Sequence, residues 1–310
     1  MLSALGWLMV VALAQVAEFH VPVREVNTPV SVFTPDGKLV DGLTAADFHV
    51  FDNGRPQRVQ MDTEFEPISL AVAVECDRAV SRSLPEIRKI PSIIEILMLG
   101  VASDAAVLGF GHEVKLVQPF THSAERIDRA MRSLAPSGDN GDSVAAALQA
   151  IDLLAHQPPK RRRLLLLIAL AGQRDQAARI RDVLAAAEAA GVRVYALTIP
   201  HSHVFSDEAA EGPAATLDLT DLVPAIFRGS KKLKAENAIA ILTQYTGGRA
   251  IEFHNQRALE SAMTALGAEF HSEYHLRYTP DSSEAGWHRL SVEVDRKGAV
   301  VRARSGYFRN

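Results

Sequence analysis

The most constraining feature of this chain is the apolar run at residues 68–76, which shows no alternation of polar and apolar positions. Strands that face water on one side alternate, whereas strands buried on both faces read as continuous apolar segments. Such strands belong to parallel sheets that helices cover on both sides. In open sheets of this kind ligands gather beyond the carboxyl ends of the strands, so a functional site is expected from Asp77 onward.

Strand and helix patterns alternate over most of the chain. Strands are expected at 69–76, 105–110, 113–118, 164–170, 192–198 and 250–253, and helices at 84–99, 123–134, 143–156, 175–190, 235–245 and 256–270. This alternation predicts an α/β fold of the Rossmann-like type, with a mostly parallel central sheet flanked by helices and right-handed crossovers. Residues 200–233 interrupt the rhythm with Pro, Gly and short polar pieces, and a long loop near the ligand-binding edge is expected there.

Both ends of the chain favour β-structure. Residues 21–64 contain strand-like segments separated by a turn at 35–38 and closed by Asn53-Gly54, and residues 273–279, 287–294 and 299–308 alternate in the same way. Two or three strands alone rarely bury a stable core, so we expect the two ends to join in one small β domain. The predicted organisation is an N-terminal β segment at 15–66, an α/β domain at 67–271, and a C-terminal β segment at 272–310 that packs with the N-terminal one.

The first residues resemble a targeting segment. Residues 2–13 are almost wholly apolar and too short to span a bilayer, and Ala12-Leu13-Ala14 has the small-x-small form of a signal-peptidase site. The segment contains no Lys or Arg, and an upstream start or an uncleaved anchor is the alternative. We therefore predict a signal peptide at 1–14, a secreted or periplasmic location, and no membrane span in the mature chain.

The loop after the first buried strand, Asp77-x-Ala79-x-Ser81, resembles the Asp-x-Ser-x-Ser loop of von Willebrand factor type A (VWA) domains. A longer resemblance to secreted bacterial VWA-related proteins covers nearly the whole mature chain. It is carried by residues 42–54, by the Thr-Gly-Gly-Arg at 246–249 and by the closing residues 301–308. In that family an Asp and two Ser of this loop, a Thr of a second loop and an Asp of a third hold a Mg²⁺ whose open position takes a partner's carboxylate. The resemblance implies a VWA fold and a role in protein binding.

The ligand positions that the resemblance implies are only partly filled. Ala79 and Ala171 stand where the family has a Ser and an Asp, and Asp142 or Ser143 takes the place of the Thr. Mg²⁺ prefers hard oxygen ligands, so the candidate metal ligands are Asp77, Ser81 and Asp142. The other interpretation is that these are ordinary loop and helix-capping residues. We predict a degenerate site without a cofactor, with Mg²⁺ as the alternative, and a binding surface made of Asp77, Ser81, Asp142 and Ser143.

Two variations of this ligand set stay open. A register that begins at Glu75 gives Glu75, Asp77 and Ala79 as the first-loop triplet, and Asp175 lies one turn beyond Ala171. The Gly-rich residues 137–141 have no Lys after them, so a turn is expected there rather than a phosphate site.

Histidines offer a second candidate metal site. His271, Glu273 and His275 have the period-two spacing that places residues on one face of a strand, and His201 and His203 lie in the long loop. Isolated histidines are more often solvated or hydrogen-bonded than metal-bound, and no further ligand pattern accompanies these. The hydrolase, NTPase and metalloprotease motifs Gly-x-Ser-x-Gly, Gly-x4-Gly-Lys-Ser/Thr and His-Glu-x-x-His are absent, and the single Cys76 is expected to be an inert buried thiol.

The charge of the chain limits its partners. The formal net charge of -4 gives no general attraction to nucleic acid or to anionic membranes. The basic run at 160–163 precedes a buried strand without interleaved aromatic residues, so a solvated strand entrance is expected. We predict a non-enzymatic, exported, adhesion-type module with an unknown protein partner and no nucleic-acid partner. The alternative is a structural or assembly component of the cell envelope that uses the β domain as its contact surface.

Overall fold

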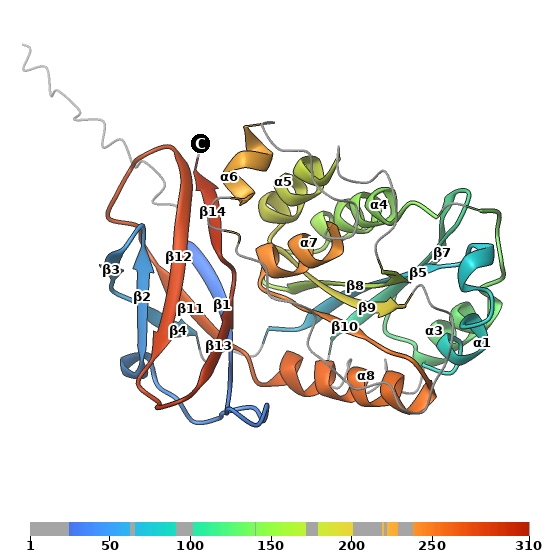
Figure 1. Ribbon diagram of the computed structural model, residues 1–310, viewed down its shortest axis with the longest axis horizontal. Coiled ribbons are helices and arrows are strands. Elements are labelled where there is room, and N and C mark those ends of the chain that lie inside the picture. Colours follow the sequence, from blue (N-terminus) through green and yellow to red (C-terminus); the bar gives the residue numbers. More distant parts are fainter. Residues whose placement is uncertain are drawn as a thin grey trace, which may run out of the picture.

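The apolar run at residues 68–76 forms strand β5 (Ile68–Glu75), whose eight residues are all buried. The computed structural model describes residues 25–62, 66–90, 102–139, 141–171, 179–200, 219, 222–228 and 238–309, and the elements named below lie within these ranges. Among the described strands, β5 belongs to a six-stranded sheet with the order β10-β9-β8-β5-β6-β7 (Figure 1). Neighbouring strands of this sheet are parallel except for β6 and β7, which form an antiparallel hairpin.

Helices cover both faces of this sheet (Figure 1). The other strands of the sheet are β6 (Asp104–Phe110), β7 (Val114–Thr121), β8 (Arg162–Leu170), β9 (Val192–Ile199) and β10 (Ala250–Glu252). The helices are α1 (Leu84–Ile87), α3 (Ala124–Ser133), α4 (Ser143–Ala155), α5 (Ile180–Ala190), α6 (Leu222–Phe227), α7 (Ala238–Thr246) and α8 (Gln256–His271). Numbered along the chain, the strand order is 3-2-1-4-5-6, which is the doubly wound order of Rossmann-like folds. The predicted Rossmann-like α/β fold is confirmed.

The side chains of β5 alternate between two apolar cores, one on each face of the sheet. Leu70 and Val72 pack with residues of α3 and α8, whereas Ala71 and Ala73 pack with residues of α4 and α5. The second face is rich in alanine on both the strand and α4, and small side chains let a helix approach the sheet closely. The buried Ala147 of α4 belongs to this core.

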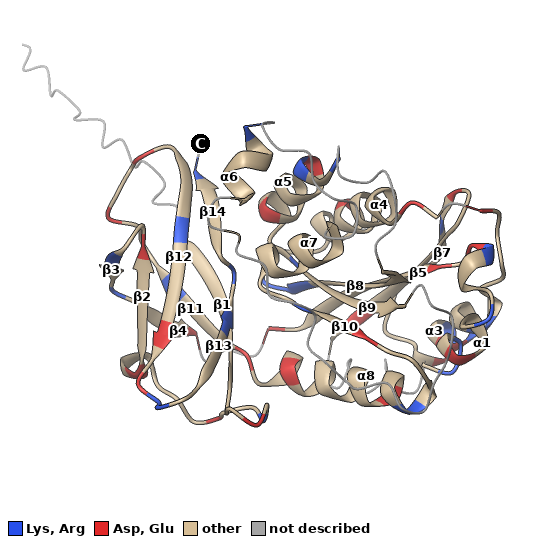
Figure 2. Ribbon diagram, in the orientation of Figure 1, with Lys and Arg blue, Asp and Glu red and all other residues tan. Residues whose placement is uncertain are grey.

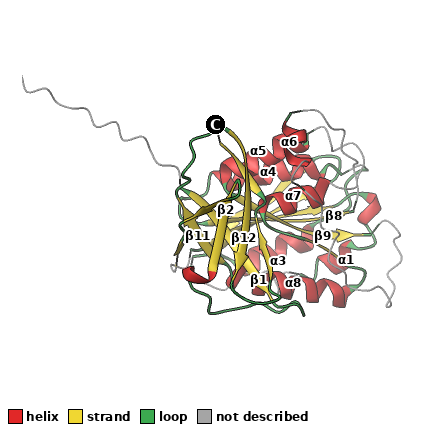
Figure 3. Cartoon of the chain, turned by 60° about the vertical axis from the view of Figure 1, so that its left-hand side comes forward, coloured by secondary structure: helices red, strands yellow, loops and turns green. Residues whose placement is uncertain are grey.

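The two ends of the chain build an antiparallel β sandwich beside the α/β unit (Figures 1 and 3). Its strands are β1 (Val26–Phe33), β2 (Phe48–Asp52), β3 (Arg55–Gln57), β4 (Gln60–Asp62), β11 (Tyr274–Tyr278), β12 (Gly286–Val294), β13 (Val300–Ala303) and β14 (Gly306–Arg309). One sheet has the order β13-β1-β11-β4 and the other β14-β12-β2-β3, so each sheet combines strands from both chain ends. Val30, Val50, Leu276 and Leu290 lie in the apolar core of the sandwich. The expected union of N- and C-terminal strands in one β domain is observed, and the residue limits given to each domain stay a prediction.

The local sequence explains one turn of the sandwich, but it does not show that the strand expected at 299–308 is divided in two. Asn53 and Gly54 both have positive φ, 50° and 78°, as a two-residue hairpin turn of type I′ requires. Residues 299–308, expected as one strand, are divided into β13 and β14, which lie in different sheets. The chain changes sheet at residues 304–305 and then passes close to β12. A Cβ on Gly306 would lie 2.3 Å from the His288 carbonyl oxygen, so glycine is required at this crossing.

Several expected elements fall partly outside the described residues. The helix expected at 84–99 is helical at Leu84–Ile87 and continues as a turn to residue 90, beyond which the expectation lies outside the description. The segments 1–14 and 201–218 lie outside it as well. Part of the expected loop at 200–233 is helical, because Leu222–Phe227 forms α6 with Val223 fully buried.

A buried ion cluster joins the sandwich to the α/β unit. Arg162 and Arg193, at the starts of β8 and β9, both form ion pairs with Glu273, which precedes β11. The exposed fractions of these three side chains are 8%, 5% and 1%, in that order. The Tyr195 hydroxyl donates a hydrogen bond to the same carboxylate at 2.8 Å. Burial alone would raise the pKa of Glu273, but the two guanidinium groups outweigh it and hold this pKa below the ordinary value of 4.5.

A second buried carboxylate, Glu269 of α8, joins the same two units. It pairs with Arg302 of β13 at 3.0 Å and with Arg249 at 2.9 Å, and the Ser31 hydroxyl of β1 lies 3.3 Å from it. These contacts, like those of Glu273, lie where the central strands begin. The sandwich therefore occupies the amino-terminal end of the sheet, and the carboxyl ends of β5 and β8 point away from it (Figure 1).

The prediction that the basic run at 160–163 is solvated was wrong for its three arginines, whereas Lys160 is exposed. Arg161 pairs with Asp104 at 2.8 Å with only 10% of its side chain exposed, and Arg162 belongs to the Glu273 cluster. Arg163 donates hydrogen bonds to the carbonyl oxygens of Ala190 and Gln157. The three arginines are held in place because the sandwich and neighbouring segments supply acceptors that a local sequence pattern does not show.

Basic and acidic residues are interspersed along the described parts of both units (Figure 2). This distribution matches the small net charge of the whole chain, -4. Among the described helices, none combines the length and the apolar character needed to cross a bilayer.

Replacing Glu273 with Ala should destabilise the chain by about 3–5 kcal/mol, because two buried guanidinium groups lose their counter-ion. The exposed Glu293 on β12 offers a matched control, and its replacement with Ala should cost no more than about 0.5 kcal/mol. Urea unfolding followed by tryptophan fluorescence measures both. A loss at Glu273 as small as that at Glu293 would contradict the structural importance of the cluster.

His275 should make the chain less stable as the pH falls. Burial, followed by the nearby Arg162, lowers the pKa of His275 from 6.5 to about 4; Glu273, Arg193 and Asp62 also face this ring. The unfolded chain binds this proton near pH 6.5 and the folded chain only near pH 4, so the free energy of unfolding falls through that window. Glu273 stays charged there and adds its own loss only below its ordinary pKa.

The measurement is a set of urea titrations between pH 7 and pH 4 on the wild-type chain and on His275→Gln. The decline between pH 6.5 and 4 should be smaller in the variant by on the order of 2–3 kcal/mol. Parallel curves for the two proteins would show that His275 does not cause the decline.

Candidate functional site

The candidate site lies at the carboxyl ends of β5 and β8, on the loops that the strand–helix pattern predicts. Asp77 follows β5 and is only 4% exposed. Its Oδ1 accepts a hydrogen bond from the Val80 amide at 3.2 Å, which caps the short 3-10 helix Arg78–Val80. Its Oδ2 accepts from the Gly141 amide at 3.1 Å. Asp77 thereby ties the first loop of the site to the second.

Glu75 and the glycine-rich loop at 137–141 complete this framework. Glu75 is fully buried, and its Oε2 accepts a hydrogen bond from the Leu170 amide at 2.8 Å, which joins the ends of β5 and β8. A Cβ on Gly141 would lie 2.8 Å from Glu75 Oε1, so a larger residue here would require the Glu75 side chain to shift. The Gly138 carbonyl accepts from the Arg78 amide at 3.1 Å. The loop acts here as a turn that packs against the end of β5.

The remaining predicted site residues already have protein partners. The Ser81 hydroxyl donates to the Arg78 carbonyl at 2.8 Å, within its own loop. Asp142 is the N-cap of α4, where its Oδ1 accepts from the Ala145 amide at 2.8 Å, and its Oδ2 forms an ion pair with Arg179. Ser143 is buried in the first turn of α4 and engaged in further interactions. The structure therefore brings Asp77, Asp142 and Ser143 together around Gly141, while Ser81 stays bound to its own loop.

Arg179 is the site residue that sequence reasoning missed. It directly precedes α5, and 46% of its side chain is exposed beside Asp142. No signal in the sequence indicated it, because the predicted helix at 175–190 placed Arg179 within a helix and not at its start. Arg78 and Asp139 form a second ion pair at 3.4 Å on the rim of the site. Both acidic positions of the second loop are thus paired with arginine.

These residues do not fit a Mg²⁺ ion. Both oxygens of Asp77 accept backbone hydrogen bonds, and one oxygen of Asp142 faces a guanidinium group. Ala79 and Ala171 add no ligand, and Asp175 lies outside the described residues. Over the described part of the chain, no three His, Cys, Asp or Glu side chains are grouped closely enough to hold a metal.

The histidine-rich groups singled out in the sequence do not assemble a second metal site among the described residues. Glu273 is engaged by two arginines in the ion cluster between the units, and His201 and His203 lie outside the described residues. Burial raises the pKa of the Cys76 thiol from 9.0 to about 12, so the thiol stays protonated at neutral pH. This agrees with the expectation of an inert buried cysteine.

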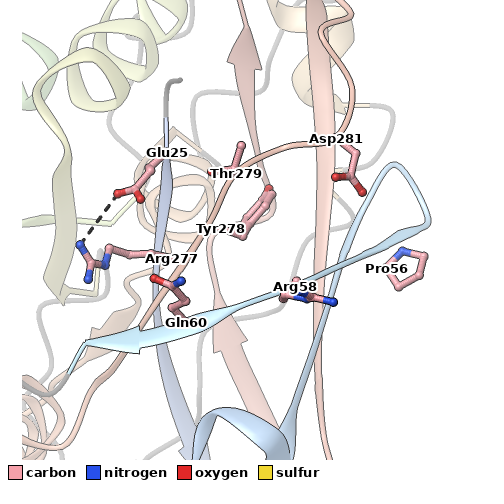
Figure 4. Close-up of a pocket in the computed structure, with 8 residues that line it drawn as sticks. All are labelled: Glu25, Pro56, Arg58, Gln60, Arg277, Tyr278, Thr279 and Asp281. Atoms are coloured by element: carbon pink, nitrogen blue, oxygen red, sulfur yellow. Dashed lines mark ion pairs between the residues drawn. The ribbon is translucent and has the colours of Figure 1, made fainter. Parts of the chain in front are cut away.

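A separate cavity of about 550 Å³ lies at one end of the sandwich (Figure 4). Its lining combines basic and acidic side chains from three segments and includes Glu25, Arg58, Gln60, Arg277 and Asp281. Glu25 and Arg277 face each other at 3.8 Å. The cavity is polar, and charges of both signs line it.

Comparisons with known proteins find only distant structural similarity. No protein-family model matches the chain, and no curated protein matches it. Similar solved structures include a von Willebrand factor type A protein from Catenulispora acidiphila, with 10% identity over 94% of this chain and 75% of that one and a TM-score of 0.46. BatB, a conserved hypothetical protein from Bacteroides thetaiotaomicron, shares 14% identity over 66% of this chain and 97% of that one, with a TM-score of 0.43.

An aerotolerance-related membrane protein from Bacteroides fragilis shares 15% identity over 66% of this chain and 98% of its own, with a TM-score of 0.44. At these identities the likeness concerns the fold alone. The fold assignment rests on the strand order 3-2-1-4-5-6 and on the antiparallel edge strand of this chain.

Replacing Asp77 with Ala should lower the stability of the chain by about 1–3 kcal/mol, because the amides of Val80 and Gly141 lose their acceptor. The loss should be equal in EDTA and in Mg²⁺, since it comes from backbone hydrogen bonds. Asp139→Ala, at an exposed position of the neighbouring loop, is the control and should change stability little. A loss that occurs only in Mg²⁺ would overturn this explanation and indicate a bound ion.

Proposed function

We propose that this chain, a VWA-type α/β domain joined to a β sandwich, is a non-enzymatic protein-interaction module that binds its partner at the carboxyl edge of the central sheet. The observation that carries the proposal is the framework beneath that edge. Asp77 and Glu75 tie the loops to each other and to the strands, so the residues above them are held in place. A binding surface that is ordered in advance loses less conformational entropy on association.

The rim of this edge has the mixed polar chemistry of a protein-binding surface. Arg78, Asp139, Asp142 and Arg179 are each between 41% and 77% exposed on their side chains. Ser81 is bound to the Arg78 carbonyl in the first loop. Exposed ion pairs of this kind contribute to the selectivity and rate of association more than to raw affinity. The small net charge of the chain and the interspersed charges of its described residues favour a protein partner over nucleic acid.

Partner binding at this edge is proposed to be independent of metal ions and of catalysis. The predicted site oxygens are used by backbone amides or by arginine, and the buried Cys76 stays protonated. No pair of a nucleophile and a base is found among the site residues described above. The apolar residues 2–13 and the small-x-small site after them support an exported, secreted or periplasmic location, which also belongs to the proposal.

A second candidate function is that of a structural or assembly component of the cell envelope that makes its contacts through the sandwich. The observation that favours it is the polar cavity lined by Arg58 and Arg277. In this case another envelope component would bind at the end of the sandwich, and the carboxyl edge of the central sheet would not take part in binding.

Site-specific photo-cross-linking in the producing cell distinguishes the two functions. A benzophenone amino acid is placed at Ser81 on the sheet edge, at Arg58 in the sandwich cavity, or at the exposed Lys297 as a control. We expect a discrete cross-linked partner from Ser81 that persists in EDTA and is absent from the control. A product from Arg58 alone would support the envelope component, and no product from either position would refute both functions.

A further inference from the structure

We propose that the polar cavity at the end of the sandwich binds a short zwitterionic peptide. Arg58 and Arg277 bind the carboxylate of the peptide. Glu25 and Asp281 bind its ammonium group. The inference goes beyond binding at the carboxyl edge of the central sheet, because strands and loops of the sandwich line this cavity. For the second candidate function, it names the chemical class of ligand that the cavity recognises.

The alternation of side chains along β11 is the first support. Leu276 and Tyr278 are buried in the core of the sandwich. Successive side chains of a strand point to opposite faces of a sheet, so Arg277 and Thr279 lie on the face that is turned away from the core. Both residues line the cavity. A guanidinium group and a hydroxyl group therefore face the cavity from this strand.

The neighbouring edge strand β4 adds further hydrogen-bond donors. Gln60 pairs with Arg277 in the register of β4 and β11. Arg58 lies two residues before Gln60, and both residues line the cavity. In the view of Figure 4, Gln60 lies between Arg58 and Arg277. Two guanidinium groups with an amide between them offer the set of N–H donors that suits the oxygens of a carboxylate.

Both arginines have donors that the described residues do not use. Arg277 lies 3.8 Å from Glu25 and 3.5 Å from Asp62, and both separations are longer than an ordinary hydrogen bond. Within the described ranges, the Arg58 side chain has neither an ion pair nor a hydrogen bond. Arg277 is 39% exposed on its side chain, so an incoming oxygen can reach its guanidinium group. These N–H groups are available to a ligand.

The charge balance of the lining selects a ligand that carries charges of both signs. The two arginines are matched by the carboxylates of Glu25 and Asp281. A simple anion would be attracted by the arginines and repelled by the carboxylates, and the reverse holds for a simple cation. The Asp281 carboxylate forms no ion pair with any described residue. A zwitterion places one charge against each kind of side chain, so its charges complement those of the cavity.

The size of the cavity sets the second limit on the ligand. Its volume of about 550 Å³ lies within the range of about 300–1,000 Å³ that small-molecule sites span. A short peptide fits this volume, whereas a folded domain does not. A neutral saccharide of similar size would leave Arg58 and Asp281 without counter-charges.

The test is isothermal calorimetry of the purified chain with four probes in low-salt buffer at neutral pH. The probes are trialanine, its N-acetyl form, its C-terminal amide and the neutral sugar maltose. Trialanine should bind. Each blocked form lacks one of the two charges and should bind at least about tenfold more weakly, and maltose should not bind.

Two variants assign the charges of the peptide to their partners. Arg58→Gln should weaken trialanine binding and reduce the preference for the free carboxylate over the amide. Asp281→Asn should weaken it and reduce the preference for the free ammonium group over the N-acetyl form. Arg289→Ala removes an exposed arginine of β12 that does not line the cavity, and it should bind trialanine as the wild type does. The far-ultraviolet circular dichroism of each variant confirms that it is folded.

No binding of trialanine at millimolar concentration would overturn the inference. Equal binding of trialanine and either blocked form would overturn it as well, because the site would then recognise a single charge. Binding of maltose alone would show a saccharide site instead. These titrations need no partner protein, so their failure is distinguishable from a failure of the cross-linking at Ser81.

Discussion

The ion cluster around Glu273 is the interaction on which the arrangement of the two units depends. One carboxylate accepts from Arg162 and Arg193, which begin two adjacent parallel strands, and from the Tyr195 hydroxyl. Burying three charges costs desolvation energy, and the pairing compensates only when the geometry is met at every partner. A displaced sandwich would leave buried guanidinium groups unpaired. The cluster therefore selects one orientation of the sandwich more than it adds to overall stability.

Helix α8 connects this cluster to the second one. Glu269 lies near the end of the helix, where Arg302 of the sandwich and Arg249 of the α/β unit both reach it. A third carboxylate, Glu188 of α5, accepts from the Phe308 amide at 2.6 Å on the other side of the sheet. The aromatic rings of Trp287 and Tyr245 stack beside it with centroids 5.8 Å apart. The sandwich is thus held on both faces of the sheet, and all of these contacts lie away from the carboxyl edge.

The sequence predicts those parts of this molecule that depend on local pattern. The continuous apolar run of β5 shows that the strand is buried on both faces, and Asn53-Gly54 has the residues that a type I′ turn requires. The same patterns do not show which charged residues meet. The sequence around Arg162 predicts an exposed basic residue, because its partner Glu273 lies 111 positions later in the chain. Likewise the break between β13 and β14 depends on the close approach of β12 at Gly306, and the alternation of polar and apolar residues does not indicate this approach.

The candidate site shows the same division. Asp77 is found because it follows an apolar strand, and the carboxyl ends of parallel strands lie at one edge of the sheet. Asp142 and Ser143 are found from the resemblance of their loop to the second loop of VWA domains. Their chemical states are set by partners from other segments. The Gly141 amide donates a hydrogen bond to the Asp77 carboxylate. Arg179, 37 positions beyond Asp142, forms an ion pair with the Asp142 carboxylate. The sequence gives the location of the site, whereas the hydrogen bonds and ion pairs that its carboxylates form depend on tertiary structure.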